Sequence, residues 1–253
     1  MRTRCRLAAL AASALLVLAG CGSQPTGGGE EPSSSGAAPS SGPAAEAPKQ
    51  AEQAVTVEVY GDSLTVADSP DLRAGRTGPQ SWVHHVDDHG VAVVGAAGRW
   101  GATADEVLQV HLRTGEDAVQ AQWLLAFLGT NDAGRAGSPD SGGFTEAHEA
   151  YVEQIGSIAE RTGYPEERVV VVGVGPINAE VAERTQAWNE PTAQAAQERG
   201  WQLVDPWERL RGPDGRYADP DHTTDGLHLS ESGAQLLAEG IAEDLHEVSR
   251  SAP

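Results

Sequence analysis

Short runs of apolar residues alternate with longer amphipathic segments from residue 55 almost to the C-terminus. The apolar runs cover residues 55–60, 91–95, 123–128, 168–173 and 202–205, and several are nearly continuous in Val, Leu or Phe. Such runs are typical of parallel strands that are covered on both faces. Because strands and helices alternate, we predict a right-handed α/β fold, a three-layer α/β/α sandwich around about five parallel strands.

Three of the amphipathic segments have helical spacing. Residues 145–162 carry one apolar stripe, and Gly163 follows as a typical end of a helix. Residues 180–199 predict a second helix, which Pro191 should break or kink. Ser230 predicts the N-cap of a last helix that runs towards the C-terminus.

The first 54 residues have a different composition. Residues 1–20 join a positively charged start to a short run of Ala, Leu and Val, which predicts a secretion signal and not a membrane-spanning helix. The sequence Leu-Ala-Gly-Cys that ends at Cys21 resembles the bacterial lipobox, so we expect acyl chains such as palmitate on Cys21 and a membrane anchor. The alternative is an ordinary cleaved signal with an incidental cysteine. Residues 21–54 predict a disordered tether rich in Gly, Ser, Pro and Glu, and residues 55–250 a single folded domain.

Cysteine content and charge narrow the chemistry of the exported part. Cys5 leaves with the signal and Cys21 carries lipid, so the domain has no disulfide, no Cys-ligated metal and no cysteine nucleophile. Loss of the three signal arginines changes the net charge from −20 to −23, since 14 basic residues then face 37 acidic ones. Such acidity argues against nucleic-acid binding and against electrostatic adhesion to anionic lipid.

Three short motifs lie at the ends of predicted elements. Ser63, in Gly-Asp-Ser-Leu, follows the first apolar run, and Asn131, in Gly-Thr-Asn-Asp, follows the third. Since the carboxyl ends of parallel strands meet at one edge of a sheet, these two residues should lie close together. Asp225 and His228 precede the last helix. Taken singly, Ser63 could be a helix N-cap and Asn131 a turn residue. Asp225 could be a surface aspartate, and His228 a histidine at the entry of a helix.

Taken together, the motifs predict acyl transfer to water. Ser63 would attack an acyl carbon, His228 would take its proton, and Asp225 would hold the imidazole. Asn131 would help to bind the oxyanion. The chemistry requires neither a cofactor nor a metal.

In order and position these motifs resemble the first, third and fifth sequence blocks of the SGNH/GDSL hydrolases. The resemblance covers residues 55–249 and implies the flavodoxin-like sandwich of that family. In the family's second block, Asn-x-x-x-x-Gly-x-Thr, a glycine N–H completes the oxyanion hole beside the nucleophile's own N–H. The nearest match starts at Ala96, so the resemblance assigns this donor to Gly101, with Gly98 as the second choice. Ala96 replaces the family's asparagine and leaves the local loop geometry open.

Two polar clusters and one tryptophan have alternative interpretations. The histidines and aspartates of residues 84–89 could bind a metal, although a solvent-exposed amphipathic face is favoured. Residues 219–222 could bind Ca²⁺, although a polar loop beside the active-site mouth is favoured. Trp100, next to the oxyanion glycine, could stack on a sugar ring or pack under the loop.

We therefore expect a monomeric serine esterase, anchored to the membrane and facing the extracellular or cell-wall side. Its substrate would be a small-molecule, lipid or glycan ester, and its acyl-enzyme would form at Ser63. Only two Phe residues argue mildly against a deep groove for a long acyl chain. The alternative is a catalytically silent domain of the same fold that binds a glycan or protein at the cell surface.

Overall fold

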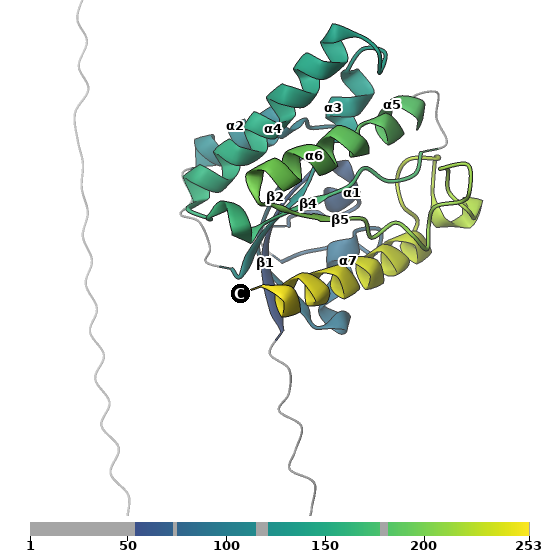
Figure 1. Ribbon diagram of the computed structural model, residues 1–253. Coiled ribbons are helices and arrows are strands. Elements are labelled where there is room, and N and C mark those ends of the chain that lie inside the picture. Colours follow the sequence, from purple (N-terminus) through teal and green to yellow (C-terminus); the bar gives the residue numbers. More distant parts are fainter. Residues whose placement is uncertain (1–53, 73–74, 115–120, 178–181, 253) are drawn as a thin grey trace, which may run out of the picture. The chain divides into compact units, whose positions relative to one another are not determined.

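The computed structural model describes residues 54–72, 75–114, 121–177 and 182–252 (Figure 1). The predicted signal, the lipid site at Cys21 and nearly all of the predicted tether lie outside these residues. In the part that is described, no helix is both long enough and apolar enough to cross a membrane.

Five parallel strands form one sheet, in the order β2-β1-β3-β4-β5, which confirms the predicted fold class. The predicted runs match the strands to within three residues at each end. The strands are β1 (Val55–Gly61), β2 (Val91–Gly98), β3 (Trp123–Phe127), β4 (Val169–Val172) and β5 (Gln202–Val204).

Helices cover both faces of the sheet, as Figure 1 shows. One layer holds α2 (Ala104–Thr114), α3 (Thr130–Arg135), α4 (Gly142–Thr162), α5 (Ala182–Ala187) and α6 (Asn189–Arg199). The other layer holds α7 (Glu231–Ser251), the short α1 (Ser63–Val66), and the 3₁₀ helices η1 (Trp82–His84) and η2 (Val86–His89). Two further 3₁₀ turns are η3 (Glu166–Arg168) and η4 (Pro220–His222).

Strands β1 and β3 each send residues into two separate cores, which explains the continuous apolar run of β3. Val57 and Val59 pack with Leu237 and Ile241 of α7, whereas Tyr60 packs in the core beneath α2 and α4. A strand that is covered on both faces needs no polar alternation, and in β1 even the polar Glu58 is buried. Burial on both faces therefore made the strands the most predictable elements of the chain.

The predicted helix over residues 180–199 is wrong as a single element. It forms two helices, α5 and α6, separated at Trp188, and its first two residues lie outside the described part. Pro191 falls in the first turn of α6, where the missing proline N–H would have no helical acceptor in any case. The break therefore precedes the proline and does not occur at it. The other two helices follow the prediction, with Gly163 ending α4 and Ser230 capping α7.

The cluster at residues 84–89 spans the end of η1 and the whole of η2. Trp82 and Val86 are buried in the core, while His84 is exposed and contacts the Thr77 hydroxyl. Throughout the described ranges, no three His, Cys, Asp or Glu side chains are grouped so that they could hold a metal ion. The amphipathic interpretation fits this segment.

The register of the sheet determines where the motifs meet. Gly61, the last residue of β1, pairs with Gly98 of β2 on one side and with Phe127 of β3 on the other. The carboxyl ends of these three strands are therefore level. The chain segments that follow them, which carry Ser63, Gly101 and Asn131, leave the sheet at the same edge.

Candidate active site

The Gly-Asp-Ser-Leu motif forms a tight connection between β1 and α1. A Cβ atom at Gly61 would lie 2.2 Å from the Thr65 hydroxyl oxygen, so only glycine lets the helix fold back against the strand. Asp62, and not Ser63, is the N-cap residue, because its carboxylate accepts a hydrogen bond from the Leu64 N–H at 2.9 Å. The alternative of an N-cap serine is therefore wrong, and the Ser63 side chain is available for other contacts.

The structure brings Ser63, His228 and Asp225 into one chain of contacts. His228 Nε2 lies 3.1 Å from Ser63 Oγ, and His228 Nδ1 lies 2.8 Å from Asp225 Oδ2. Both distances are within hydrogen-bond range. A base between a hydroxyl and a carboxylate can remove the hydroxyl proton while the carboxylate orients it.

Asp225 and His228 lie in a turn that several hydrogen bonds hold together. Asp225 Oδ1 accepts the backbone N–H groups of Leu227 at 3.0 Å and His228 at 2.7 Å. The His228 carbonyl in turn accepts the Thr223 hydroxyl at 2.7 Å and the Thr224 N–H at 2.8 Å. The three-residue spacing thus lets one carboxylate fix both the backbone and the ring of the histidine. This aspartate turn positions the imidazole before any substrate arrives.

Asp225 stays ionised although it is part of an active-site contact. Burial is the largest single influence on its pKa and acts to raise it, but the side chain and backbone N–H groups of His228 and the N–H of Leu227 outweigh it. The net result is a pKa below the ordinary value. An ionised carboxylate at this position stabilises a protonated imidazole.

Two backbone N–H groups beside the serine are free to bind a negative charge. Within the described residues, the N–H groups of Ser63 and Gly101 have no hydrogen-bond acceptor. Gly101 lies in a turn closed by a hydrogen bond from the Ala102 N–H to the Arg99 carbonyl, and its φ of +64° favours glycine. Gly98, the second choice from the sequence, lies within β2. The turn therefore presents the Gly101 amide, and the Gly98 amide belongs to the strand.

Asn131 reaches across to both of these segments. Its side-chain amide donates to Asp62 Oδ2 at 3.1 Å and to the Ala102 carbonyl at 3.0 Å. The alternative of a turn asparagine bonded to its own backbone is therefore wrong. Asn131 ties the start of α3 to the nucleophile segment and to the Gly101 turn, and its role towards an oxyanion stays a prediction.

Two carboxyl groups of the site, the buried Asp62 and the partly buried Asp132, were not assigned a role from the sequence. Burial raises the pKa of Asp62 to about 7, and the neighbouring charge of Asp132 adds to this effect. Burial likewise raises the pKa of Asp132 to about 6, while its carboxylate accepts the Ala104 N–H at the start of α2. Each lies directly beside a motif residue, which was the available signal. Their burial depends on how three loops converge, and no local pattern reveals that.

The Trp100 side chain lies against the ring of His228 and does not pack under the loop. It is 54% exposed, its ring centroid lies 4.6 Å from that of His228, and its indole N–H donates to the Ala67 carbonyl at 2.8 Å. Ala67, at the end of α1, has a φ of +43°, a conformation that costs a non-glycine residue about 1–3 kcal/mol. The side chain thus joins the end of the nucleophile helix to the histidine.

The polar loop of residues 219–222 is held by its own hydrogen bonds. Asp219 accepts the Asp221 N–H at 2.9 Å, and the hydroxyls of Ser230 and Ser232 donate to the Asp221 carbonyl. This loop forms η4 and contacts the start of α7, close in sequence to the aspartate turn. Its acidic side chains are not grouped with a third ligand in the described residues, and the structure supports a polar loop.

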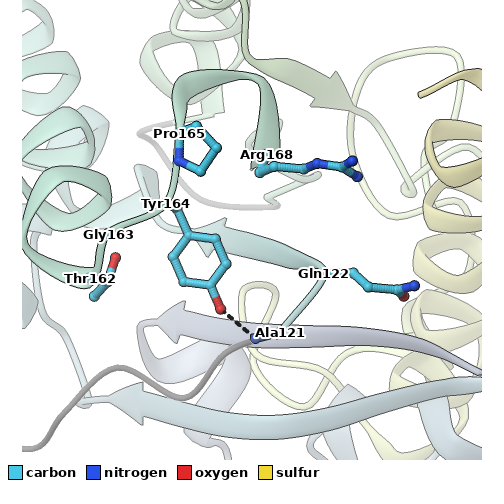
Figure 2. Close-up of a pocket in the computed structure, with 7 residues that line it drawn as sticks. All are labelled: Ala121, Gln122, Thr162, Gly163, Tyr164, Pro165 and Arg168. Atoms are coloured by element: carbon cyan, nitrogen blue, oxygen red, sulfur yellow. Dashed lines mark hydrogen bonds between the residues drawn. The ribbon is translucent and has the colours of Figure 1, made fainter. Parts of the chain in front are cut away.

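A separate cavity of about 390 Å³ lies at the opposite edge of the sheet (Figure 2). Its lining includes Gln122, just before β3, and Arg168, just before β4. Tyr164 crosses it, accepting the Ala121 N–H at 2.9 Å and donating to buried Glu58 at 3.1 Å. Because it lies at the amino ends of these strands, it is distinct from the edge that carries Ser63.

Comparisons with known proteins agree with this geometry. The model of the GDSL-like lipase/acylhydrolase family matches residues 59–236 of the chain, which include all three motifs. A comparison with curated proteins gives no match.

Solved structures with the same fold share little sequence with this chain. A G-D-S-L family protein from Desulfitobacterium hafniense DCB-2 is 20% identical with a TM-score of 0.56, covering 75% of this chain and 99% of its own. A member of the lipolytic protein G-D-S-L family from Veillonella parvula DSM 2008 is 18% identical with a TM-score of 0.56, covering 75% and 97%. A GDSL-like lipase from Bacteroides thetaiotaomicron VPI-5482 is 17% identical with a TM-score of 0.50, covering 78% and 92%. At these identities the similarity establishes the fold alone.

Proposed function

Because the chain belongs to the GDSL-like lipase/acylhydrolase family, and is thus an ester-hydrolysing serine hydrolase, we propose that it is an exported, membrane-tethered esterase that cleaves short-chain acyl esters through an acyl-enzyme at Ser63. The observation that carries this proposal is the unbroken chain of contacts from Ser63 Oγ through His228 to Asp225. The natural ester could be part of a small molecule, a lipid or a glycan.

Acylation begins with proton transfer inside this chain of contacts. His228 Nε2 takes the Ser63 hydroxyl proton as Oγ bonds to the carbonyl carbon of the ester. The Nδ1–H stays on the imidazole and keeps its hydrogen bond to Asp225, whose lowered pKa keeps the carboxylate negative beside the new imidazolium. The tetrahedral intermediate then expels the alcohol, which receives its proton from His228 Nε2.

The carbonyl oxygen becomes negative in the same step and needs donors. The free N–H groups of Ser63 and Gly101 are available on adjacent segments, and Asn131 contributes its amide when it releases a resting acceptor. One such donor lowers the barrier by about 3–4 kcal/mol in comparable sites. Water then attacks the acyl-enzyme with His228 as the base, and the acid product and Ser63 are released.

The departure at Ala96 does not disturb this machinery. Ala96 lies inside β2, where it pairs with Val59 of β1, and the Gly101 turn begins after the strand has ended. The feature that motivated a catalytically silent domain thus lies in the strand and not in the turn that carries the Gly101 donor. Catalysis is the function that the geometry supports.

The membrane tether rests on sequence alone. The Leu-Ala-Gly-Cys sequence that ends at Cys21 and the Gly/Ser/Pro/Glu-rich stretch after it support a lipid anchor on an exported protein. The high acidity of the chain supports attachment through the lipid and not through basic side chains.

Replacement of the nucleophile tests the proposed reaction. Ser63→Ala should abolish hydrolysis of p-nitrophenyl acetate and labelling by a fluorophosphonate probe, because both need an activated Oγ. Ser138→Ala, which changes an exposed serine outside the site, is the matched control and should keep both. Hydrolysis or labelling that persists in Ser63→Ala at the control level would end the proposal. Folded wild-type protein that the probe does not label would favour the silent, binding domain.

A further inference from the structure

Trp100 is the exposed apolar group at the mouth of this site. Across the described residues, the exposed large hydrophobic side chains are Val94, Trp100 and Leu203. Val94 lies on the edge strand β2 and Leu203 on the edge strand β5, whereas Trp100 contacts the ring of His228. Within the described residues, the exposed side of this indole beside the proposed base is not covered by another apolar side chain, and an exposed apolar group at such a position indicates a role towards substrate.

The contact with His228 indicates which half of an ester the indole would meet. His228 Nε2 must protonate the departing alkoxide, so the alcohol oxygen lies within about 3 Å of Nε2 during the reaction. The Trp100 ring centroid lies only 4.6 Å from the imidazole centroid. A ring attached to the alcohol oxygen would therefore be held beside the imidazole that the indole contacts. The acyl group leaves the carbonyl carbon in another direction.

The indole is held in place before substrate binds. Trp100 occupies the second position of the turn from Arg99 to Ala102, and its N–H is bonded to the Ala67 carbonyl at 2.8 Å. Both ends of the side chain are thus fixed, and little rotamer entropy is lost when a ligand covers the exposed face. A fixed flat face favours a flat or chair-shaped ring over a flexible chain.

The surroundings of this face are charged. Arg99 is exposed beside it, Arg135 donates to the Gly101 carbonyl at 2.6 Å, and the Asp225 side chain is 54% exposed. An acyl chain needs a continuous apolar surface, whereas a sugar ring offers one C–H face to an aromatic ring and hydroxyls to polar neighbours. We propose that Trp100 is the platform for a pyranose ring on the alcohol side of the ester, so that the substrate is an O-acylated sugar. This inference rests on the proposed esterase function.

The test compares three acetate esters that differ only in the alcohol: a mono-acetylated methyl pyranoside, cyclohexyl acetate and ethyl acetate. Wild-type kcat/KM should be highest for the pyranoside. Trp100→Ala should lower the ratio of kcat/KM for the pyranoside to that for ethyl acetate by about tenfold, because the lost stacking area serves only the ring. Trp100→Phe, which keeps an aromatic face, should lower this ratio less. Leu203→Ala, an exposed apolar side chain on β5, is the control and should leave the ratio unchanged.

Three outcomes would overturn the platform. An equal loss for the pyranoside and for ethyl acetate in both Trp100 variants would make Trp100 a positioning residue that acts through His228 and Ala67. Wild-type activity on cyclohexyl acetate that equals activity on the pyranoside would make the face merely apolar. Unchanged kcat/KM for both esters in both variants would remove Trp100 from recognition. If Trp100→Ala does not fold, Trp100→Phe decides alone. Failure of the esterase function itself would show separately, as ethyl acetate turnover that survives Ser63→Ala.

Discussion

The buried carboxyl of Asp62 should make the stability of the folded domain fall as pH rises. Asp62 is fully buried at the N-cap of α1, and burial raises its pKa from the ordinary 3.8 to about 7. A carboxyl with a raised folded-state pKa binds its proton more tightly in the folded state. Its stabilising contribution is therefore present below the unfolded value and is lost as pH rises through about 7.

The size of this effect follows from the two pKa values. Between them the folded state holds one more proton than the unfolded state, so the free energy of unfolding falls by about 1.4 kcal/mol per pH unit. Over the whole interval from 3.8 to about 7 the loss is about 4 kcal/mol. Asp132, whose pKa is raised to about 6, adds a loss of the same sign at lower pH.

Asp62→Asn removes the titrating carboxyl group and should remove its contribution to the fall of the free energy of unfolding with pH. Urea unfolding at several values from about pH 4.5 to about pH 6.5 gives the free energy of unfolding of wild type and variant. The altered contacts to Leu64 and Asn131 shift the variant's stability by a constant amount, whereas the difference in slope reports the proton alone. Asp140→Asn makes the same chemical change at an exposed position and should run parallel to wild type. Parallel lines for Asp62→Asn as well would refute the reasoning.

Two further predictions concern the base and the anchor. Asp225→Asn should lower kcat by about 10³–10⁴-fold with little change in KM, because the side-chain oxygen of the asparagine stays with the N–H groups of Leu227 and His228, so that its NH₂ group faces Nδ1 and imposes the wrong tautomer on His228. Steady-state kinetics on p-nitrophenyl acetate measures the loss, and a loss in kcat below about tenfold would contradict this role. Cys21→Ser should move the protein from the membrane fraction to the medium and prevent incorporation of labelled palmitate, and palmitate labelling that persists in the variant would disprove the lipid site.

The sheet and the three motifs could be predicted from the sequence because each depends on a local pattern. Residues 123–127 follow one another without a polar residue, which indicates a strand buried on both faces. Ser63 and Asn131 follow such strands directly, and parallel strands bring their carboxyl ends together. The order of the sequence thus already implies one site.

Other features depend on contacts between distant segments and were not predictable in this way. The division of α5 from α6 occurs at Trp188, which is fully buried between the helices and the aromatic cluster of α4. The burial of Asp62 depends on α3, which lies about 70 residues away in sequence. The exposure of Trp100 depends on a turn whose outer side happens to face the histidine. Tertiary packing decides each of these, and a single-sequence pattern contains none of it.

Because the Asn131 amide is already hydrogen-bonded, it distinguishes a neutral ester carbonyl from a negatively charged oxyanion. Its two hydrogens already have acceptors, Asp62 and the Ala102 carbonyl, so a neutral ester carbonyl that approaches must compete with another neutral carbonyl and gains nothing by displacing it. An oxyanion forms a hydrogen bond about twice as strong and can therefore displace the Ala102 carbonyl from the amide. If Asn131 binds the oxyanion as predicted, this donor would be withheld from the bound ester and given only to the intermediate, which is the condition under which binding energy raises kcat and does not merely lower KM.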